Sequence, residues 1–333
     1  MKNLLAVLVT VFLFAGCSSK SYFEPKVVAG TASYNGSVVT PIVDQTRSGA
    51  TLADGRVITK RSGLLQTGRL PKGFRYINDN ETSLIAVDIY GDVDILSKSD
   101  FSLIHKAKFD SQILSATLKG NYLALVDANN NIILYDISSS SVIYKEQLHD
   151  AVAVDTRLAN PLFLNDIVVY PTLDGRLLIM NIYEKRVIRD IAISDNDIFN
   201  NVIFLEVSGD VLIAATRSKV ISVTTNDIKT YKIGVKDIVY DQDKVYVFTK
   251  DGRVVLLTNS LQKINELKLP NAVFSGAFLG KSKIYAVEKT GYLIAIAKDL
   301  SSYQVKELSD KIEAPVFGAE DKVYIGDKYI ILQ

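Results

Sequence analysis

An all-β fold, in which short strands form a closed ring of small sheets, is predicted by three observations. Apolar strands recur from end to end of the chain, in pairs joined by short turns rich in Asp, Asn and Gly. These turns return at an average spacing of about 39 residues. After the first 16 residues, no segment shows the 3.6-residue apolar period of a helix.

The strand pairs are clearest in two copies of one pattern. They are Lys244–Leu257, which reads KVYVFTKDGRVVLL, and Ile167–Met180, which reads IVVYPTLDGRLLIM. The Asp-Gly pair tolerates the positive φ that a tight hairpin between twisted strands requires. Both faces of each strand are apolar, which is typical of a sheet covered on both sides.

Eight such turns predict eight blades of a single β-propeller, because about 40 residues hold three or four short strands. The number falls to seven if the first or last copy is incomplete. The turns are centred on Gly55, Gly91, Asn130, Gly175, Ser218, Gly252, Gly291 and Asp327. A surplus strand around residues 26–33 is expected to pair in the last blade and close the ring, since an open ring leaves bare sheet edges. The propeller is predicted to span residues 26–333.

The N-terminus is predicted to be an export signal. Residues 4–16 form an apolar run of 13 residues after Lys2, too short to cross a bilayer and suited to a signal peptide over residues 1–16. The run ends in Phe-Ala-Gly-Cys17, which resembles the lipobox of bacterial lipoproteins. Cys17 is therefore the predicted lipidation site and residues 17–25 a tether. The alternative is an ordinary signal peptide with a chance cysteine.

The residue after the cysteine indicates the membrane to which a lipoprotein is sorted. Ser18 resembles the default outer-membrane signal of lipoproteins. This predicts a lipid-anchored outer-membrane protein that faces the periplasm, with inner-membrane sorting as the alternative.

Composition limits the function classes. The chain has 38 Lys and Arg against 37 Asp and Glu, a net charge of +1, so no nucleic-acid partner is expected. With one Cys no disulfide framework is possible, and a Cys-based metal site is disfavoured.

Catalytic patterns are absent from the sequence. His105, in an expected outer strand, and His149, in an expected loop, are not spaced as metal ligands. Neither a G-x-S-x-G nucleophile turn nor a glycine-rich phosphate loop occurs. Asp54, Asp174 and Asp251 begin turns where Asp is favoured for its conformation. We therefore predict no catalytic residues, no metal and no cofactor, and a protein that is not an enzyme.

Longer connections mark the candidate partner-binding loops, because insertions in a propeller lie on its faces. The two longest repeats place extra residues at 155–163 and 194–200, and a third basic and aromatic loop spans 68–75. Cationic and apolar side chains together are typical of interface hot spots. The candidates are Arg157, Leu158, Phe163, Asp195, Asp197, Phe199, Arg69, Phe74 and Arg75. The alternative is longer loops without a role.

The repeat V-Y-x-x-x-x-D-G-x-L-x-x-L resembles that of the quinoprotein-type (PQQ-like) propellers, over roughly residues 45–330. With a lipobox and eight blades, the chain is similar to the BamB type of outer-membrane β-barrel assembly lipoprotein. The family's tryptophan docking motif is missing, since residues 137–144 and 182–188 stand in its place and the chain has no Trp. Aliphatic or Tyr packing is expected instead.

The resemblance implies a periplasmic, membrane-anchored scaffold that binds envelope proteins, with the β-barrel assembly machinery as the specific partner. One alternative is a structural component of a large envelope machine, such as a secretion or motility apparatus. The other is an enzymatic or ligand-binding propeller, for which the sequence offers no residues.

Overall fold

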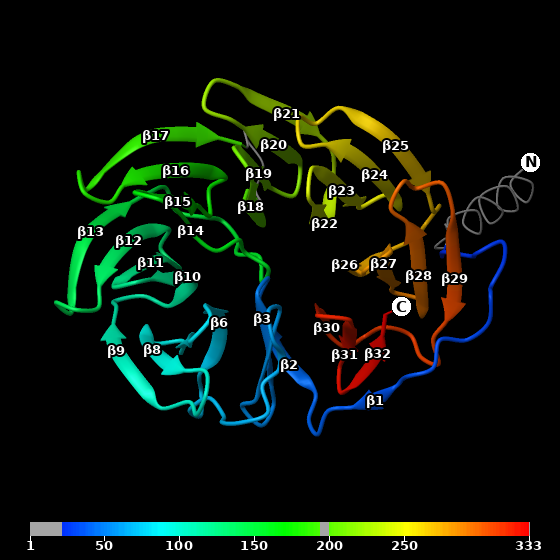
Figure 1. Ribbon diagram of the computed structural model, residues 1–333, viewed down its shortest axis with the longest axis horizontal. Coiled ribbons are helices and arrows are strands. Elements are labelled where there is room, and N and C mark those ends of the chain that lie inside the picture. The colour runs from blue at the N-terminus through cyan, green and yellow to red at the C-terminus, as the bar shows by residue number, and fades with distance from the viewer. Residues whose placement is uncertain (1–21, 194–199, 333) are drawn as a thin grey trace, which may run out of the picture.

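The chain folds into a ring of eight antiparallel sheets. The computed structural model describes residues 22–193 and 200–332, and within these ranges it has thirty-two strands and no helix. Each sheet has four strands, and the sheets stand side by side around a central axis (Figure 1). The predicted all-β propeller with eight blades is confirmed, and the alternative of seven blades is wrong.

Within each blade the first strand lies nearest the axis and the fourth at the rim (Figure 1). Blades 1 to 4 are formed by β2 (Ile42–Gln45), β3 (Gly49–Leu52), β4 (Val57–Thr59), β5 (Gly63–Leu64); β6 (Arg75–Asp79), β7 (Ser83–Val87), β8 (Asp92–Ser97), β9 (Leu103–Lys108); β10 (Ile113–Lys119), β11 (Tyr122–Asp127), β12 (Asn131–Asp136), β13 (Ser141–Gln147); and β14 (Leu162–Leu164), β15 (Ile167–Pro171), β16 (Arg176–Asn181), β17 (Arg186–Ala192). Blades 5 to 8 are formed by β18 (Phe204–Ser208), β19 (Val211–Ala215), β20 (Lys219–Val223), β21 (Ile228–Lys232); β22 (Val235–Asp241), β23 (Lys244–Thr249), β24 (Arg253–Thr258), β25 (Lys263–Lys268); β26 (Phe274–Leu279), β27 (Lys283–Glu288), β28 (Tyr292–Ala297), β29 (Tyr303–Glu307); and β30 (Val316–Ala319), β31 (Lys322–Ile325), β32 (Lys328–Ile331) with β1 (Gly36–Ser37).

The predicted turns all lie between the second and third strands of a blade. Gly291 shows why glycine is needed there: its φ is 104°, and a Cβ atom would lie 2.7 Å from the carbonyl oxygen of Asp310. In blade 3, Asn130 takes this place with a φ of 57°. Its buried side chain donates to the carbonyl of His149 and accepts from the amide of Leu173, so this turn also joins blade 3 to blade 4.

The ring is closed by the N-terminal part of the chain, although not by the residues we expected. β1 (Gly36–Ser37) pairs antiparallel with β32 as the fourth strand of blade 8. The prediction that residues 26–33 form this strand is wrong. Residues 29–32 instead bond to β29 at the rim of blade 7, in the parallel direction, through two amide donors to Val305 and Glu307, each at 2.8 Å. The closing strand must come later because it has to end beside the β31–β32 turn, close to the start of β2.

The folded body also begins earlier than predicted. Phe23 falls in the range 17–25 that we expected to be a tether, yet it is 5% exposed and belongs to the core between blades 6 and 7. Its ring packs edge-on against Tyr292, with centroids 5.7 Å apart. We refer to residues 23–33 as the N-terminal strap.

The hydrophobic core lies between neighbouring blades and is built from aliphatic, Phe and Tyr side chains. Phe248 of blade 6 packs edge-on against Phe274 of blade 7, with centroids 5.2 Å apart. The hydroxyl of Tyr170 in blade 4 donates to the carbonyl of Ile133 in blade 3 at 3.0 Å. Ile182, in one of the segments that replace the docking motif, is 7% exposed in the core. The predicted aliphatic and Tyr packing is confirmed.

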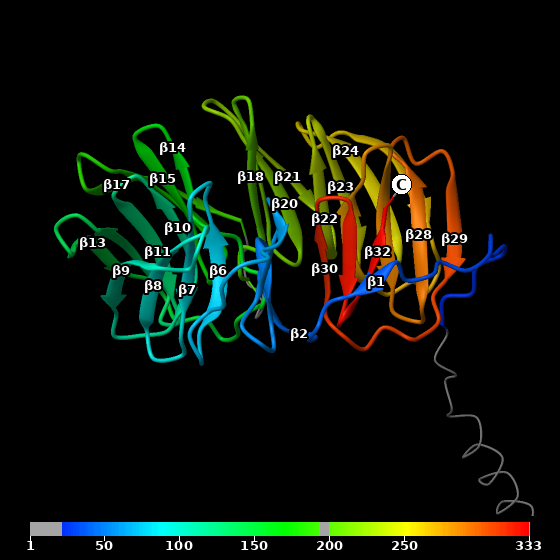
Figure 2. The same cartoon turned by 60° about the horizontal axis from the view of Figure 1, so that its bottom comes forward.

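The strands run between two faces of the ring, as the oblique view in Figure 2 shows. One face carries the turns between second and third strands and the connections from each blade to the next. We call it the connection face, and the other the opposite face.

Candidate functional site

The connection from blade 3 to blade 4 enters the channel and contacts the other side of the ring. Within it, Asn160 donates from its side-chain amide to the hydroxyl of Ser48 in blade 1 at 2.8 Å and accepts from the amide of Ala116 in blade 3 at 3.3 Å. The carboxylate of Asp155 forms an ion pair with Arg217 of blade 5. We call residues 154–160 the crossing segment, because it bonds to three other blades through these two residues.

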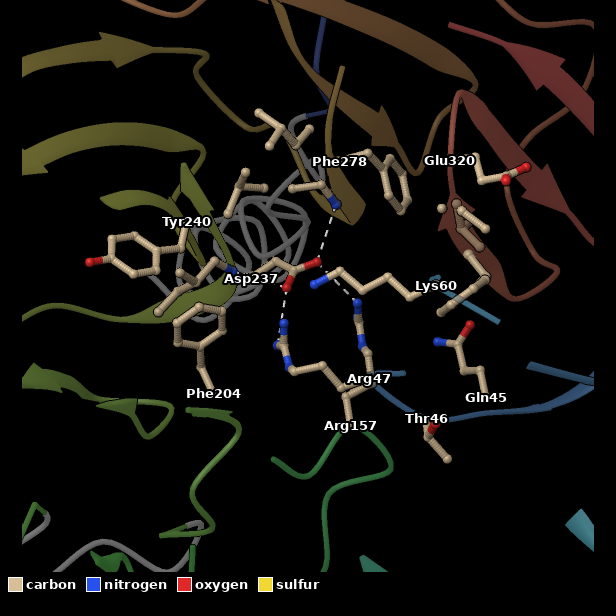
Figure 3. A pocket seen from close by; sticks show the side chains of 18 of the residues that line it. Gln45, Thr46, Arg47, Lys60, Arg157, Phe204, Asp237, Tyr240, Phe278 and Glu320 are labelled. Atoms are coloured by element: carbon tan, nitrogen blue, oxygen red, sulfur yellow. Dashed lines mark hydrogen bonds and ion pairs between the residues drawn. The ribbon is translucent and has the colours of Figure 1, made fainter. Parts of the chain in front are cut away.

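A cluster of three charges lies where the crossing segment meets the channel wall (Figure 3). Asp237 of β22 pairs with Arg157 of the crossing segment at 3.1 Å and with Arg47 of blade 1 at 3.2 Å. The side chains are 7%, 17% and 17% exposed, respectively. We call Asp237, Arg157 and Arg47 the central triad.

Local backbone features aim the triad inward. A register shift between Val235 and Asp237 gives β22 an extra residue opposite β23, and such bulges re-aim side chains. Arg47 sits in the β2–β3 turn, which Thr46 holds by accepting from the amides of Ser48 and Gly49. The guanidinium of Arg47 also lies over the ring of Phe204 in blade 5, at 5.2 Å from its centroid.

Electrostatics keep the triad ionised. Burial raises the pKa of the Asp237 carboxyl. The positive charges of Arg157 and Arg47 and the hydrogen bonds from the amides of Ile238 and Ala277 lower it, and together they outweigh burial. The net pKa of Asp237 therefore lies below its ordinary value of 3.8. A carboxylate engaged by two guanidiniums and two amides has its lone pairs occupied, so this arrangement suits a structural link better than acid–base chemistry.

The triad separates cavities on the two sides of the ring, because Arg157 lines a cavity on each side. The cavity toward the opposite face, drawn in Figure 3, has a volume of about 290 Å³ and is lined by Phe204, Tyr240 and Phe278 among others. A second cavity of about 420 Å³ adjoins it at Arg47 and Lys60. The triad therefore lies between the cavities of the two faces.

Two open cavities lie at the channel mouth on the connection face. The first, which we call the basic cavity, has a volume of about 550 Å³ and is lined by Gln45, Val154, Asp155, Thr156, Arg157, Asn201, Arg217, Lys236 and Lys250. The second, the neutral cavity, has a volume of about 640 Å³. Both include Gln45, Thr156 and Lys236, so together they form one continuous depression.

The structure places the predicted loop residues in different surroundings. Arg157 lies in the central triad, and Leu158 is 7% exposed in the core. Phe163, in β14, packs partly buried against the core between blades 3 and 4. Arg157 and Leu158 thus fix the crossing segment and offer little surface to a partner in this conformation. Asp195, Asp197 and Phe199 lie outside the described residues, as does Cys17.

The residues of the third predicted loop do not come together. Arg69 is 62% exposed in its side chain, 3.7 Å from Asp54. Phe74 packs partly buried against the core between blades 1 and 2. Arg75 turns to the channel side, where it donates to the carbonyl of Ile113 at 3.1 Å.

Sequence reasoning missed Arg47, Lys236 and Asp237, which do most to shape the channel. A usable signal was present for two of them, since the first strand of blade 6 begins Val-Lys-Asp, with charges inside an apolar strand. For Arg47 the sequence shows only one cation in a polar turn. Its ionic partner, Asp237, is 190 residues away in the sequence, so pattern alone could not bring the two together.

Two further observations concern other classes of site. Among the residues that the structure describes, no group of three or more His, Cys, Asp or Glu side chains is placed to hold a metal ion. Over the same residues, no helix has the length and apolar character needed to span a membrane.

The fold and site define an eight-bladed propeller with a buried charge cluster in its channel, and comparison with solved structures agrees on the fold. No family model matches the chain. It is 30% identical to the plasminogen-binding protein PgbB of Helicobacter pylori in strain J99 (327 residues) and in strain 26695 (319 residues). The matches cover 85% and 82% of this chain, and 60% and 58% of the relatives. The chain thus spans about 60% of the length of the curated relatives that it matches.

Solved structures with this fold include BamB from Moraxella catarrhalis, with a TM-score of 0.67 and 14% identity over 89% of this chain and 100% of that one. The C-terminal WD40 domain of Sif2 has a TM-score of 0.67 and 15% identity, over 92% and 100% of the two chains. The computationally designed Ika8 protein has a TM-score of 0.63 and 12% identity, over 93% and 100%. At these identities the likeness shows the fold alone.

Proposed function

We propose that the protein is a non-catalytic scaffold of the cell envelope that binds another protein through its connection face. The observation that carries this proposal is a set of exposed apolar side chains on that face, three of which, Val43, Val154 and Val273, line the cavities at the channel mouth. Exposed apolar groups gathered at one place mark interaction sites on soluble domains. They are Val39, Val43, Val152, Val154 and Val273, with exposures of 81%, 60%, 80%, 47% and 46%.

A more specific form of the proposal assigns the scaffold a cellular location and a partner. Cys17 carries lipid, the protein is held on the periplasmic side of the outer membrane, and the partner is a component of the β-barrel assembly machinery. The lipobox resemblance supports the anchor, and the BamB-like fold supports the partner. Because Phe23 is docked on blade 7, the six residues back to Cys17 span at most about 20 Å, which keeps the ring close to the membrane.

Replacing Cys17 with Ser is expected to abolish lipidation and release the protein into the soluble periplasmic fraction, because several acyl chains are needed for stable anchoring. The measurement is radiolabelled palmitate incorporation together with separation of the two membranes by density. Label that persists in the Cys17→Ser variant contradicts the lipidation site. Labelled protein found in the inner membrane contradicts the outer-membrane address.

Partner binding is tested with charges placed on the connection face. The double variant Val43→Glu/Val273→Glu is expected to lose a crosslinked envelope partner at least tenfold, because each Glu puts a charge into the apolar contact. The matched control is Val142→Glu, on outer strand β13, where Val142 is 49% exposed. If the wild type, the double variant and the control recover the partner equally, the connection face is not the binding surface. A partner outside the barrel-assembly machinery refutes that specific role.

Plasminogen is a second candidate partner, because the curated relatives are named for binding it. The 30% identity across most of this chain favours this candidate. The same wild-type and variant proteins, applied to immobilised plasminogen, test it directly. Absence of saturable binding by the wild type would refute plasminogen as a partner of this chain.

A further inference from the structure

The basic cavity at the channel mouth holds more positive charge than its own carboxylate balances. Its lining has four cationic side chains, Arg157, Arg217, Lys236 and Lys250, against the carboxylate of Asp155. Within the described chain, the two arginines have anionic partners and the two lysines have none.

The arginines are paired and fixed. Arg217 pairs with Asp155 and also donates to the backbone carbonyl of Lys236 at 2.7 Å. Arg157 pairs with Asp237 in the central triad. Both guanidiniums are therefore already engaged by carboxylates of the protein, and they form part of the wall of the basic cavity.

The lysines remain available. Over residues 22–193 and 200–332, neither Lys236 nor Lys250 has a carboxylate within 4.0 Å of its ammonium group. Burial lowers the pKa of Lys236, and repulsion from Arg157 and Arg217 lowers it further, more than Asp237 and Asp155 offset. The potential at this point is positive, so an anion placed here is stabilised.

The shape around the lysines favours an extended ligand. The neutral cavity continues from Lys236 past Val43 and Val273 toward residues 312–316. Its charges balance, with Lys236 and Lys289 facing Asp44 and Glu313. A small ion would use the basic cavity alone, whereas a peptide that alternates acidic and apolar side chains would use both cavities.

We infer that the channel mouth binds an acidic, apolar-interspersed peptide segment of a protein partner, with its carboxylates on Lys236 and Lys250 and its apolar side chains on Val43, Val154 and Val273. This inference rests on the proposed function, because it names the chemistry of the partner for the same face. Charge complementarity and the continuous depression are its basis.

The test is fluorescence anisotropy with a labelled ten-residue peptide in which Glu alternates with Leu, added to the full chain in detergent. Lys236→Gln/Lys250→Gln is expected to weaken binding at least tenfold, because two charge-assisted contacts are lost. The matched control, Lys119→Gln/Lys281→Gln, removes two exposed lysines from the opposite face and should bind as the wild type does. A peptide with Gln for Glu should bind at least tenfold more weakly.

Four outcomes overturn the inference. They are no saturable binding by the wild type, equal weakening by both lysine pairs, equal binding of the Gln peptide, and complete displacement by millimolar inorganic phosphate, which would show a small-anion site. The two proposals fail separately. A crosslinked partner that Lys236→Gln/Lys250→Gln retains refutes the peptide chemistry alone, and peptide binding without any face-dependent partner refutes the scaffold.

Discussion

Replacing Asp237 with Asn is expected to lower the free energy of unfolding by about 3–5 kcal/mol, which is the usual effect of removing one partner from a buried ion pair. The substitution keeps the shape of the side chain but leaves Arg47 and Arg157 without their shared anion. The loss is measured by chemical denaturation. Asp227→Asn is the control, because the Asp227 side chain is 59% exposed and 3.8 Å from Lys229. This control substitution should lower the free energy of unfolding by about 0–1 kcal/mol. A similar small loss for both variants would contradict the structural role of the triad.

The same pair of proteins gives a pH signature. The pKa of Asp237 is lower in the folded chain than its ordinary 3.8, so its contribution to stability is fully present well above that value. It is lost as the pH falls through 3.8 toward the folded pKa. The wild type should therefore lose more stability than Asp237→Asn on acidification through this range. Parallel curves for the two proteins would show that the carboxylate is not stabilised as described.

Removing residues 22–37 is expected to open the ring at blade 8. The deletion takes away β1 and the N-terminal strap, including Phe23, and truncation of a buried Phe alone costs about 3–5 kcal/mol. The amide of Ile331, which donates to the side chain of Asn35 at 2.8 Å, should lose its protection from hydrogen exchange. The bare edge of β32 should also promote self-association.

A point variant separates the two attachments of the N-terminal segment. Phe23→Ala removes the contact with blade 7 but leaves β1 in place, so the amide of Ile331 should stay protected while overall stability falls. If the deletion protein keeps a monomeric ring with a protected Ile331, then β1 is not what closes blade 8.

The turns and blade number could be predicted because they depend on local chemistry. An Asp-Gly or Asn-Asn pair between two apolar strands has few conformations open to it, and a turn such as that at Gly252 lies where the pattern places it. The packing that replaces Trp follows from the same repeats, since Tyr and Ile stand at corresponding positions.

The closing strand and the channel could not be predicted in the same way. The sequence favours a strand at residues 26–33 over Gly36–Ser37, and the actual choice depends on how β32 lies relative to β2 in space. The central triad joins residues from three distant blades, and no spacing records that contact. The loop lengths did identify the crossing segment, but they could not show that Arg157 turns inward.

The order of the N-terminal attachments has a mechanical consequence when tension is applied to the N-terminus. Tension from the N-terminus meets Phe23 first, then the bonds of residues 29–32 to β29, and only then β1. The contact with β29 comprises several backbone hydrogen bonds around the parallel bridge between Thr31 and Glu307, and these must break before β1 is loaded. The N-terminal strap would therefore bear tension applied at the N-terminus before it reached the pairing of β1 with β32 that closes the ring.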